Sequence, residues 1–247
     1  MRHAALTEPS TGWTGQVVVH GHFGRPVLVF PSEAGSSWDF ENNGMLDAVR
    51  WLVDGGRVKF YCVDAADAMT WSDQSVSLEE RARRHDVYES WILNQVLPFI
   101  DDDLGGGVSD LITMGCSLGA YHAANIALRH ADLFPLALCF SGSYDPSEWN
   151  AWGERGTAVY FHNPIDYVSN LEGEHLDWLR SRVRLVLVVG QGAWEVNPTR
   201  ALPSTRRFAE VLASKGIPHE LDVWGDDVPH DWPSWQRQLA HHLPRLC

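Results

Sequence analysis

The chain has 247 residues, 45% of them hydrophobic, which allows a large buried core and excludes a disordered chain. It carries 32 acidic and 19 basic residues, for a formal net charge of -13. Because such a charge repels phosphate groups, nucleic acid and anionic membrane surfaces are poor partners. No apolar run approaches the roughly 20 residues that span a bilayer, and residues 1–15 lack the apolar core of a secretory signal. We therefore expect a cytoplasmic protein.

Segments typical of strands and of helices alternate along the chain. Short apolar runs predict strands at 17–19, 27–30, 58–63, 111–114, 136–140, 183–189 and 220–224. Helical patterns cover 45–53, 77–100, 118–130, 199–215 and 235–242. Near-continuous apolar strands that alternate with helices indicate a mostly parallel sheet covered on both faces. We expect a single α/β domain over residues 1–247, with an irregular insertion at about 143–180 before the penultimate strand.

A G-x-S-x-G motif at residues 115–119 stands between a predicted strand and a predicted helix. In that context a serine on a sharp turn presents its hydroxyl to a substrate carbonyl, so Ser117 is the predicted nucleophile. Cys116 is a better intrinsic nucleophile but occupies the wrong position, where its side chain should point away from the site. A structural turn without catalysis is the alternative.

The partners of such a serine follow it along the chain in the order acid, then histidine. His230 lies in the loop after the last predicted strand and is the predicted general base. Glu195 is the only carboxylate in the loop after strand 183–189 and is the predicted acid, which would orient the imidazole. Three other carboxylates remain alternatives for the acid: Asp145, Asp226 and Asp227.

Backbone amides should stabilise the oxyanion that forms on the substrate. The N–H of Leu118, at a helix N-terminus, is one predicted donor. The second should come from the small-residue loop at 31–38, with Glu33 or Ala34 as candidates. Of the 12 tryptophans, five fall in predicted loops or in the insertion, where aromatic faces would suit a substrate, with padding of the core as the alternative: Trp38, Trp149, Trp152, Trp194 and Trp232. Trp38, Trp194 and Trp232 are the three assigned to substrate binding.

Three stretches of the sequence resemble a known family. They are Gly115-Cys116-Ser117-Leu118-Gly119-Ala120-Tyr121-His122-Ala123-Ala124-Asn125, Phe140-Ser141-Gly142-Ser143-Tyr144-Asp145 and His230-Asp231-Trp232-Pro233-Ser234-Trp235. In them the chain resembles the putative esterase family of the α/β-hydrolase superfamily, to which esterase D, feruloyl esterases and mycolyltransferases belong. The resemblance implies an α/β-hydrolase fold and a serine esterase with Ser117 and His230 in its catalytic triad. Family members often carry the acid as an Asp at the position of Ala193, so Glu195 would have to replace it.

The function expected from these residues is hydrolysis of carboxylic esters through an acyl-enzyme on Ser117. This chemistry requires no metal or organic cofactor, and we expect no metal site. The expected partner is a small-molecule ester, and a homodimer is only the default among oligomers. Two alternatives remain open: an acyltransferase that uses the same site, and a weak or inactive hydrolase-fold protein that binds without catalysis.

Overall fold

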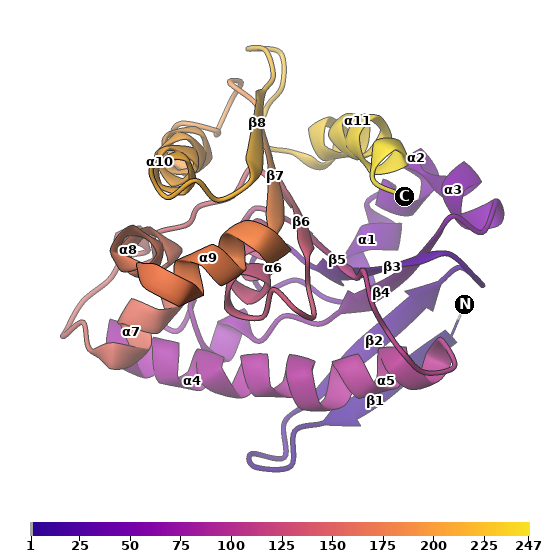
Figure 1. The fold of residues 1–247 in the computed structure, drawn as a ribbon, viewed down its shortest axis with the longest axis horizontal. Helices are drawn as coiled ribbons and strands as arrows, with labels where there is room; N and C mark the ends of the chain where they lie inside the picture. Colours follow the sequence, from indigo (N-terminus) through magenta and orange to yellow (C-terminus); the bar gives the residue numbers. More distant parts are fainter. Residues whose placement is uncertain (1) are drawn as a thin grey trace.

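One twisted sheet organises the molecule (Figure 1). The computed structural model describes residues 2–247, and its strands lie in the order β1-β2-β4-β3-β5-β6-β7-β8. They are β1 (Arg2–Thr7), β2 (Thr14–His20), β3 (Arg25–Phe30), β4 (Val58–Val63), β5 (Ile112–Cys116), β6 (Leu136–Phe140), β7 (Arg184–Val189) and β8 (His219–Val223). β2 is antiparallel to β1 and β4, and all other neighbouring strands are parallel. The predicted mostly parallel sheet is confirmed; β1 is an additional strand.

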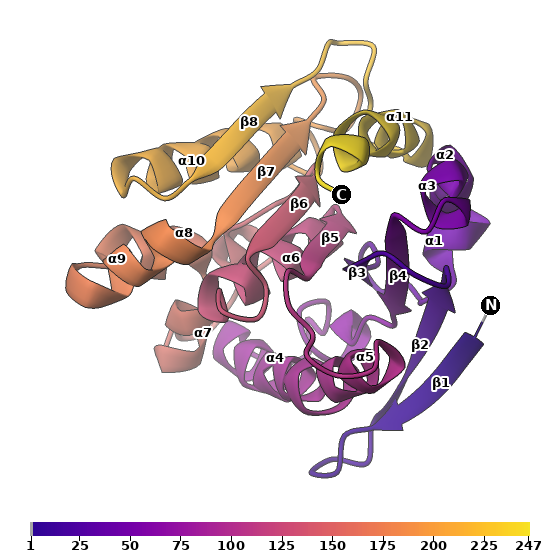
Figure 2. The ribbon, with the colours of Figure 1, turned by 45° about the vertical axis from the view of Figure 1, so that its right-hand side comes forward.

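Helices cover both faces of this sheet (Figure 2). They are α1 (Asp39–Asn42), α2 (Met45–Ala48), α3 (Arg50–Asp54), α4 (Leu78–Trp91), α5 (Leu97–Asp103), α6 (Leu118–Arg129), α7 (Thr157–His162), α8 (Pro164–Asn170), α9 (Gly173–Arg182), α10 (Ala201–Ser214) and α11 (Trp232–His242). Because strand side chains alternate, Phe60 of β4 packs with α1, α2, α3 and α11, while Tyr61 packs with α4 and α6. Within residues 2–247, no helix is long and apolar enough to cross a membrane.

The predicted helix 77–100 is interrupted by a π-helical turn, η2 (Ile92–Val96), between α4 and α5. Pro98 lies in the following turn. A proline has no N–H to bond the carbonyl four residues earlier, and its ring collides with that carbonyl. The wider π turn just before Pro98 relieves this collision. The predicted helix 45–53 is likewise divided, at Val49, into α2 and α3.

The expectation of an irregular segment at 143–180 was wrong. This segment forms the short 3-10 helix η3 (Pro146–Glu148) and the helices α7, α8 and α9. α8 is capped by the side chain of its own Asn163, which accepts a hydrogen bond from the Ile165 N–H at 3.1 Å. α7 instead depends on a side chain that lies far away in the sequence. Such caps produce no periodic pattern of apolar residues, so these helices could not be predicted from the sequence.

Glu79 of α4 caps the start of α7 from outside. Its side chain is buried, and its carboxylate accepts hydrogen bonds from the backbone N–H groups of Gly156, Ala158 and Val159 at 2.8, 3.1 and 3.1 Å. Burial acts to raise the pKa of Glu79, but these three amides and Arg83 outweigh it and lower the pKa below its ordinary value of 4.5. The ionised carboxylate therefore stabilises the fold above that ordinary value, and the contribution is lost as the pH falls through the lowered, folded-state pKa.

We expect Glu79→Gln to lower the free energy of unfolding at pH 7 by about 1–2 kcal/mol, because three amides lose a charged acceptor. The difference from wild type should shrink below the ordinary pKa of 4.5, where the wild-type carboxyl group begins to bind protons. Urea unfolding at pH 7 and at acidic pH measures both effects. Glu80→Gln is the matched control, since Glu80 makes only partly exposed pairs with Arg83 and Arg84. Equal effects of the two substitutions at pH 7 would contradict the cap.

Candidate active site

Ser117 stands at the sharp turn between β5 and α6. Its backbone has φ 56° and ψ -121°, a conformation that residues other than glycine seldom adopt and that stores strain. The Ser117 N–H donates to the carbonyl of Phe140 on β6 at 2.9 Å, which fixes the turn to the neighbouring strand. The side chain is thereby presented at the carboxyl edge of the parallel sheet, as the motif predicts.

The two glycines of the motif permit this turn. A Cβ atom on Gly115 would lie 2.2 Å from the carbonyl oxygen of Gly119, and one on Gly119 would lie 2.3 Å from the carbonyl oxygen of Pro31. Both distances are far shorter than any normal contact. The first turn of α6 therefore packs directly on the backbone that follows β3, and only glycine allows that approach.

Ser117, His230 and Glu195 form a hydrogen-bonded chain. The Nε2 atom of His230 lies 3.0 Å from the Oγ atom of Ser117, and its Nδ1 atom lies 3.2 Å from Oε2 of Glu195. The Glu195 side chain is fully buried. Its carboxylate favours a proton on Nδ1 of His230, which leaves Nε2 as the acceptor that faces the serine hydroxyl. The structure thus brings together the three residues that the sequence singled out from separate loops.

Glycines also fit the loop of Glu195 to the loop of His230. A Cβ atom on Gly190 would lie 2.0 Å from the carbonyl oxygen of Val228. The Gly192 N–H donates to that same carbonyl at 2.9 Å, and the His230 N–H donates to the carbonyl of Ala193 at 2.9 Å. Ala193 therefore contributes its backbone to the histidine loop, and the carboxylate arrives from further along the same loop.

A further pair of side chains, absent from the sequence prediction, supports the carboxylate. The Ser141 hydroxyl donates to Oε1 of Glu195 at 2.6 Å and accepts from Nε1 of Trp235 at 3.1 Å. The Trp235 ring also packs edge-on against His230, with ring centroids 5.0 Å apart. Both residues lie in the stretches that resemble the family, which is the signal that could have found them. Together they fix Glu195 and His230 relative to each other.

The alternative acids lie elsewhere. Asp145 is held by Arg207 at 2.9 Å and by the side-chain amide of Asn163, the residue before α8. Asp227 faces an arginine of α11 at 3.7 Å, and Asp226 is exposed. Among the described residues, none of these three carboxylates bonds to His230.

Cys116 is buried behind the turn. Burial, and then the neighbouring Cys139, raise the pKa of the Cys116 thiol well above its ordinary value, so the sulfur stays protonated. A protonated, buried thiol is a poor nucleophile. Cys116 is therefore no competitor for Ser117.

The expected oxyanion donors are only partly supported. Within the described chain, the backbone N–H groups of Leu118 and Glu33 donate to no protein acceptor. The N–H of Ala34 instead donates to Oδ2 of Asp67 at 3.1 Å, so Ala34 was a wrong candidate. Its amide is already committed to a buried carboxylate, and Glu33 remains as the partner of Leu118.

A cavity of about 370 Å³ opens beside the serine, within the size range of small-molecule sites. It is lined by aromatic, polar and charged side chains: Glu33, Trp71, Ser72, Gln74, Ser117, Leu118, Ser143, Glu148, Trp149, Asn150, Pro198, Thr199 and Arg200. The indole rings of Trp71 and Trp149 meet edge-to-face in its wall, 5.4 Å apart. These two rings are its aromatic surface.

The three tryptophans predicted to bind substrate do not line this cavity. Trp232 begins α11 and packs edge-on against Trp235, 5.0 Å away. Trp38 packs on the hydrophobic cluster between the sheet and α11. Trp194, next to Glu195 in the chain, is 63% exposed. Packing against α11 and the sheet, which the sequence does not reveal, accounts for the positions of Trp232 and Trp38, while Trp194 is exposed to solvent.

One group of side chains within residues 2–247 has the composition of a metal site: Asp222, His241 and His242, with ligand atoms within 4.8 Å of one another. None of them contacts the serine or its partners. Arg245 donates to Nδ1 of His242, which leaves the proton of the neutral ring on Nε2, 3.0 Å from Asp222. The group therefore joins β8 to the end of α11.

Residues 53–246 match the family described as "Putative esterase". The chain belongs to this family. The resemblance drawn from the sequence motifs is thereby confirmed, and the protein is a carboxylic ester hydrolase by family. No curated protein matches the chain.

Several solved structures are similar to this chain over nearly its whole length. A ferulic acid esterase has a TM-score of 0.73 at 16% identity and covers 99% of this chain and 96% of its own. MPT51 (FbpC1) of Mycobacterium tuberculosis has a TM-score of 0.74 at 16% identity, covering 100% and 98%. The S-formylglutathione hydrolase of Agrobacterium tumefaciens has a TM-score of 0.73 at 15% identity, covering 99% and 93%. At such identities the similarity confirms the α/β-hydrolase fold.

Substitution of Gly119 by alanine should push α6 away from the end of β3. The added methyl group would lie 2.3 Å from the Pro31 carbonyl oxygen and 2.5 Å from that of Phe30. We expect the free energy of unfolding to fall by about 1–3 kcal/mol, measured by urea unfolding, with a parallel loss of ester hydrolysis. Since alanine is otherwise the better helix former by about 1 kcal/mol, a more stable Gly119→Ala protein would show that this contact is not tight.

Proposed function

We propose that the protein hydrolyses small-molecule carboxylic esters through an acyl-enzyme intermediate on Ser117. The observation that carries the proposal is the hydrogen-bonded chain from the Ser117 hydroxyl through His230 to the buried carboxylate of Glu195. This arrangement is what nucleophilic acyl transfer by a serine requires. The adjoining cavity offers space for the ester beside the hydroxyl.

In the first half of the reaction, Nε2 of His230 removes the Ser117 proton as Oγ attacks the ester carbonyl carbon. The negative charge that develops on the carbonyl oxygen is stabilised by the N–H groups of Leu118 and Glu33. Glu195 stabilises the imidazolium. The tetrahedral intermediate then expels the alcohol, which takes the proton from His230, and the acyl group stays on Ser117.

In the second half, His230 removes a proton from water, and the resulting hydroxide adds to the acyl carbon. Collapse of this second intermediate breaks the bond to Oγ, and the imidazolium returns the proton to Ser117. The products are the carboxylic acid and the alcohol. Gln74, Ser143 and Asn150 add polar groups to the lining of the cavity.

Replacement of Ser117 by alanine should abolish turnover of p-nitrophenyl acetate and labelling by a fluorophosphonate probe, because no nucleophile remains. Release of p-nitrophenolate and gel fluorescence measure the two effects. Cys116→Ala is the matched control and should keep both, since that thiol is buried and protonated. Activity that survives in Ser117→Ala would end the proposal.

Glu195→Gln should lower kcat for the same ester by about 10³–10⁴-fold, because a neutral amide neither fixes the required tautomer of His230 nor stabilises the imidazolium. Asp145→Asn, which changes a carboxylate that does not contact His230, should leave kcat within a few-fold of wild type. Comparable losses in the two variants would assign the role of the acid to neither residue.

A further inference from the structure

The carboxylate of Asp67 is buried between the two segments that carry the proposed oxyanion donors. Asp67 opens the short helix η1 (Asp67–Met69) after β4, and its side chain is fully buried. Its Oδ2 accepts from the N–H of Ala34 at 3.1 Å, and its Oδ1 lies 2.9 Å from Nε2 of His122. Ala34 follows Glu33, while His122 lies on α6, whose first residue is Leu118. One carboxylate therefore links both parts of the oxyanion site.

The segment that carries Glu33 is a tight turn, which we call the oxyanion loop (residues 32–35). Its ends are joined by a hydrogen bond from the Gly35 N–H to the Ser32 carbonyl at 2.9 Å, and Ala34 has a positive φ of 51°. In such a turn the second residue directs its N–H away from the turn, which leaves the Glu33 amide free to face a substrate. The bond from Ala34 to Asp67 holds the next peptide group of the loop in place.

A second contact ties the oxyanion loop to the same region of the chain. The Ser72 hydroxyl donates to Oε1 of Glu33 at 2.5 Å, and the Ser72 N–H donates to the backbone carbonyl of Asp67 at 2.9 Å. The loop is thus held at two successive residues by one short segment, 67–72. Glu33 and Ser72 both line the cavity.

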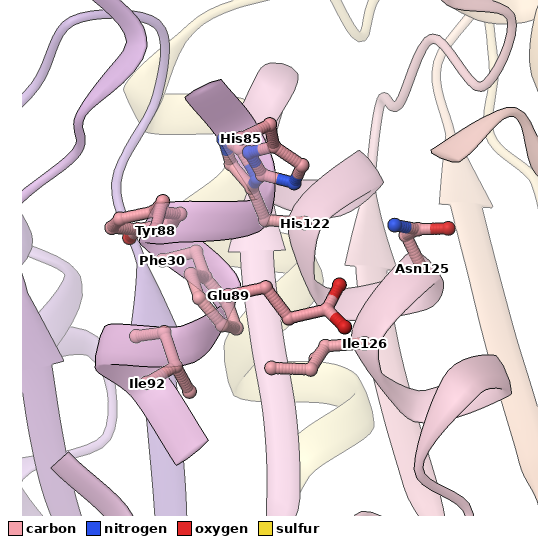
Figure 3. A pocket seen from close by; sticks show the side chains of 8 residues that line it. All are labelled: Phe30, His85, Tyr88, Glu89, Ile92, His122, Asn125 and Ile126. Atoms are coloured by element: carbon pink, nitrogen blue, oxygen red, sulfur yellow. The ribbon is translucent and has the colours of Figure 1, made fainter. Parts of the chain in front are cut away.

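On the other side of Asp67, His122 is held rigidly within α6. Its ring lies 5.1 Å from His85, 5.4 Å from Tyr88 and 5.7 Å from Phe30, measured between centroids, and Figure 3 shows the two imidazoles next to each other. The Nδ1 atom of His122 is buried without a protein partner, and the residue lines a cavity of about 10 Å³, room for about one water molecule. Nε2 therefore carries the proton that is donated to Asp67. A shift of α6 would move this donor.

The cost of burying a carboxylate ties the position of the oxyanion loop to that of α6. A carboxylate in a protein interior is costly unless its oxygens are hydrogen-bonded. Asp67 receives one bond from the oxyanion loop and one from α6, so displacement of either segment leaves a buried oxygen without its donor. Oxyanion donors act only within about 2.7–3.1 Å of the developing charge, which makes their relative placement critical.

We propose that Asp67 is a positioning residue for the hydrolysis: it holds the oxyanion loop in register with α6, so that the Glu33 and Leu118 amides converge on one oxygen of the transition state. The proposal rests on the proposed function, because it concerns the same reaction. It adds a role for a residue that touches neither the serine nor the cavity.

The test compares kcat and KM for p-nitrophenyl acetate in wild type, Asp67→Ala and Asp67→Asn. Alanine removes both bonds, and kcat should fall about 10–100-fold with KM within about twofold, because misplaced oxyanion donors weaken only the transition state. Asparagine can still accept from Ala34 and can donate to His122 once that ring moves its proton to Nδ1. It should therefore restore most of the lost kcat. The inhibition constant of phenylboronic acid, which forms a tetrahedral adduct on serine, should rise in proportion to the fall in kcat.

Asp73→Ala is the matched control just after segment 67–72, since the Asp73 carboxylate bonds to Ser75 and Arg84 and not to the oxyanion loop. A folded Asp67→Ala protein with wild-type kcat would overturn the positioning role while leaving Ser117-dependent hydrolysis intact. A wild-type protein without any Ser117-dependent turnover would overturn the proposed function itself.

If Asp67→Ala does not fold, Asp67→Asn still tests the carboxylate, and Ser72→Ala tests whether segment 67–72 positions the oxyanion loop, because Ser72 is partly exposed and its hydroxyl bonds Glu33. Loss of its bond to Glu33 should lower kcat about 3–10-fold at unchanged KM, a part of the effect of losing a donor entirely. A Ser72→Ala protein with wild-type kcat would overturn the positioning of the loop by segment 67–72.

Discussion

The close approach of Gly119 to the backbone after β3 is the contact on which the rest of the site depends. It places the start of α6 directly against the carbonyl oxygens of Phe30 and Pro31, with no space for a side chain between them. The turn at Ser117 and the free amide of Leu118 are thereby set beside the oxyanion loop. This steric constraint fixes the backbone that carries the polar contacts of the site.

Two buried carboxylates, Glu195 and Asp67, organise the polar groups of the site, and each has different hydrogen-bond partners. Glu195 is bonded by His230, by the Ser141 hydroxyl and by the Gly190 N–H at 3.3 Å, so its charge is directed at the imidazole. Asp67 is bonded by a loop amide and by a histidine of α6, so its charge joins two pieces of backbone. Both acids are fully buried and neither lines the cavity, which leaves the cavity itself to substrate and water.

The sequence predicted the fold and the proximity of Ser117, His230 and Glu195, because strand–turn–helix chemistry and chain order constrain both. It could not choose between Glu33 and Ala34, since the direction of an N–H depends on the φ of one residue in a turn. It pointed to Trp38, Trp194 and Trp232, whereas Trp71 and Trp149 line the cavity, because the position of a ring depends on packing between distant elements.

Asp67 was also missed. Its only local signal is its place in the segment that follows the buried strand β4, at the carboxyl edge of the sheet, where ligand sites of open α/β folds gather.

The loop of Glu195 shows that a longer acidic side chain, placed further along a loop, can bring a carboxylate to the same histidine. The carboxylate reaches His230 from two positions beyond Ala193, where the family often has an Asp, and glutamate has one methylene more than aspartate. The feature that selection can preserve is thus the position of a carboxylate beside an imidazole. That position can be occupied by aspartate or glutamate, and from different places in the loop. A sequence search that requires aspartate at a fixed position would classify this chain as an inactive member of the family. The Glu195 carboxylate nevertheless lies beside His230, where the acid of a triad belongs.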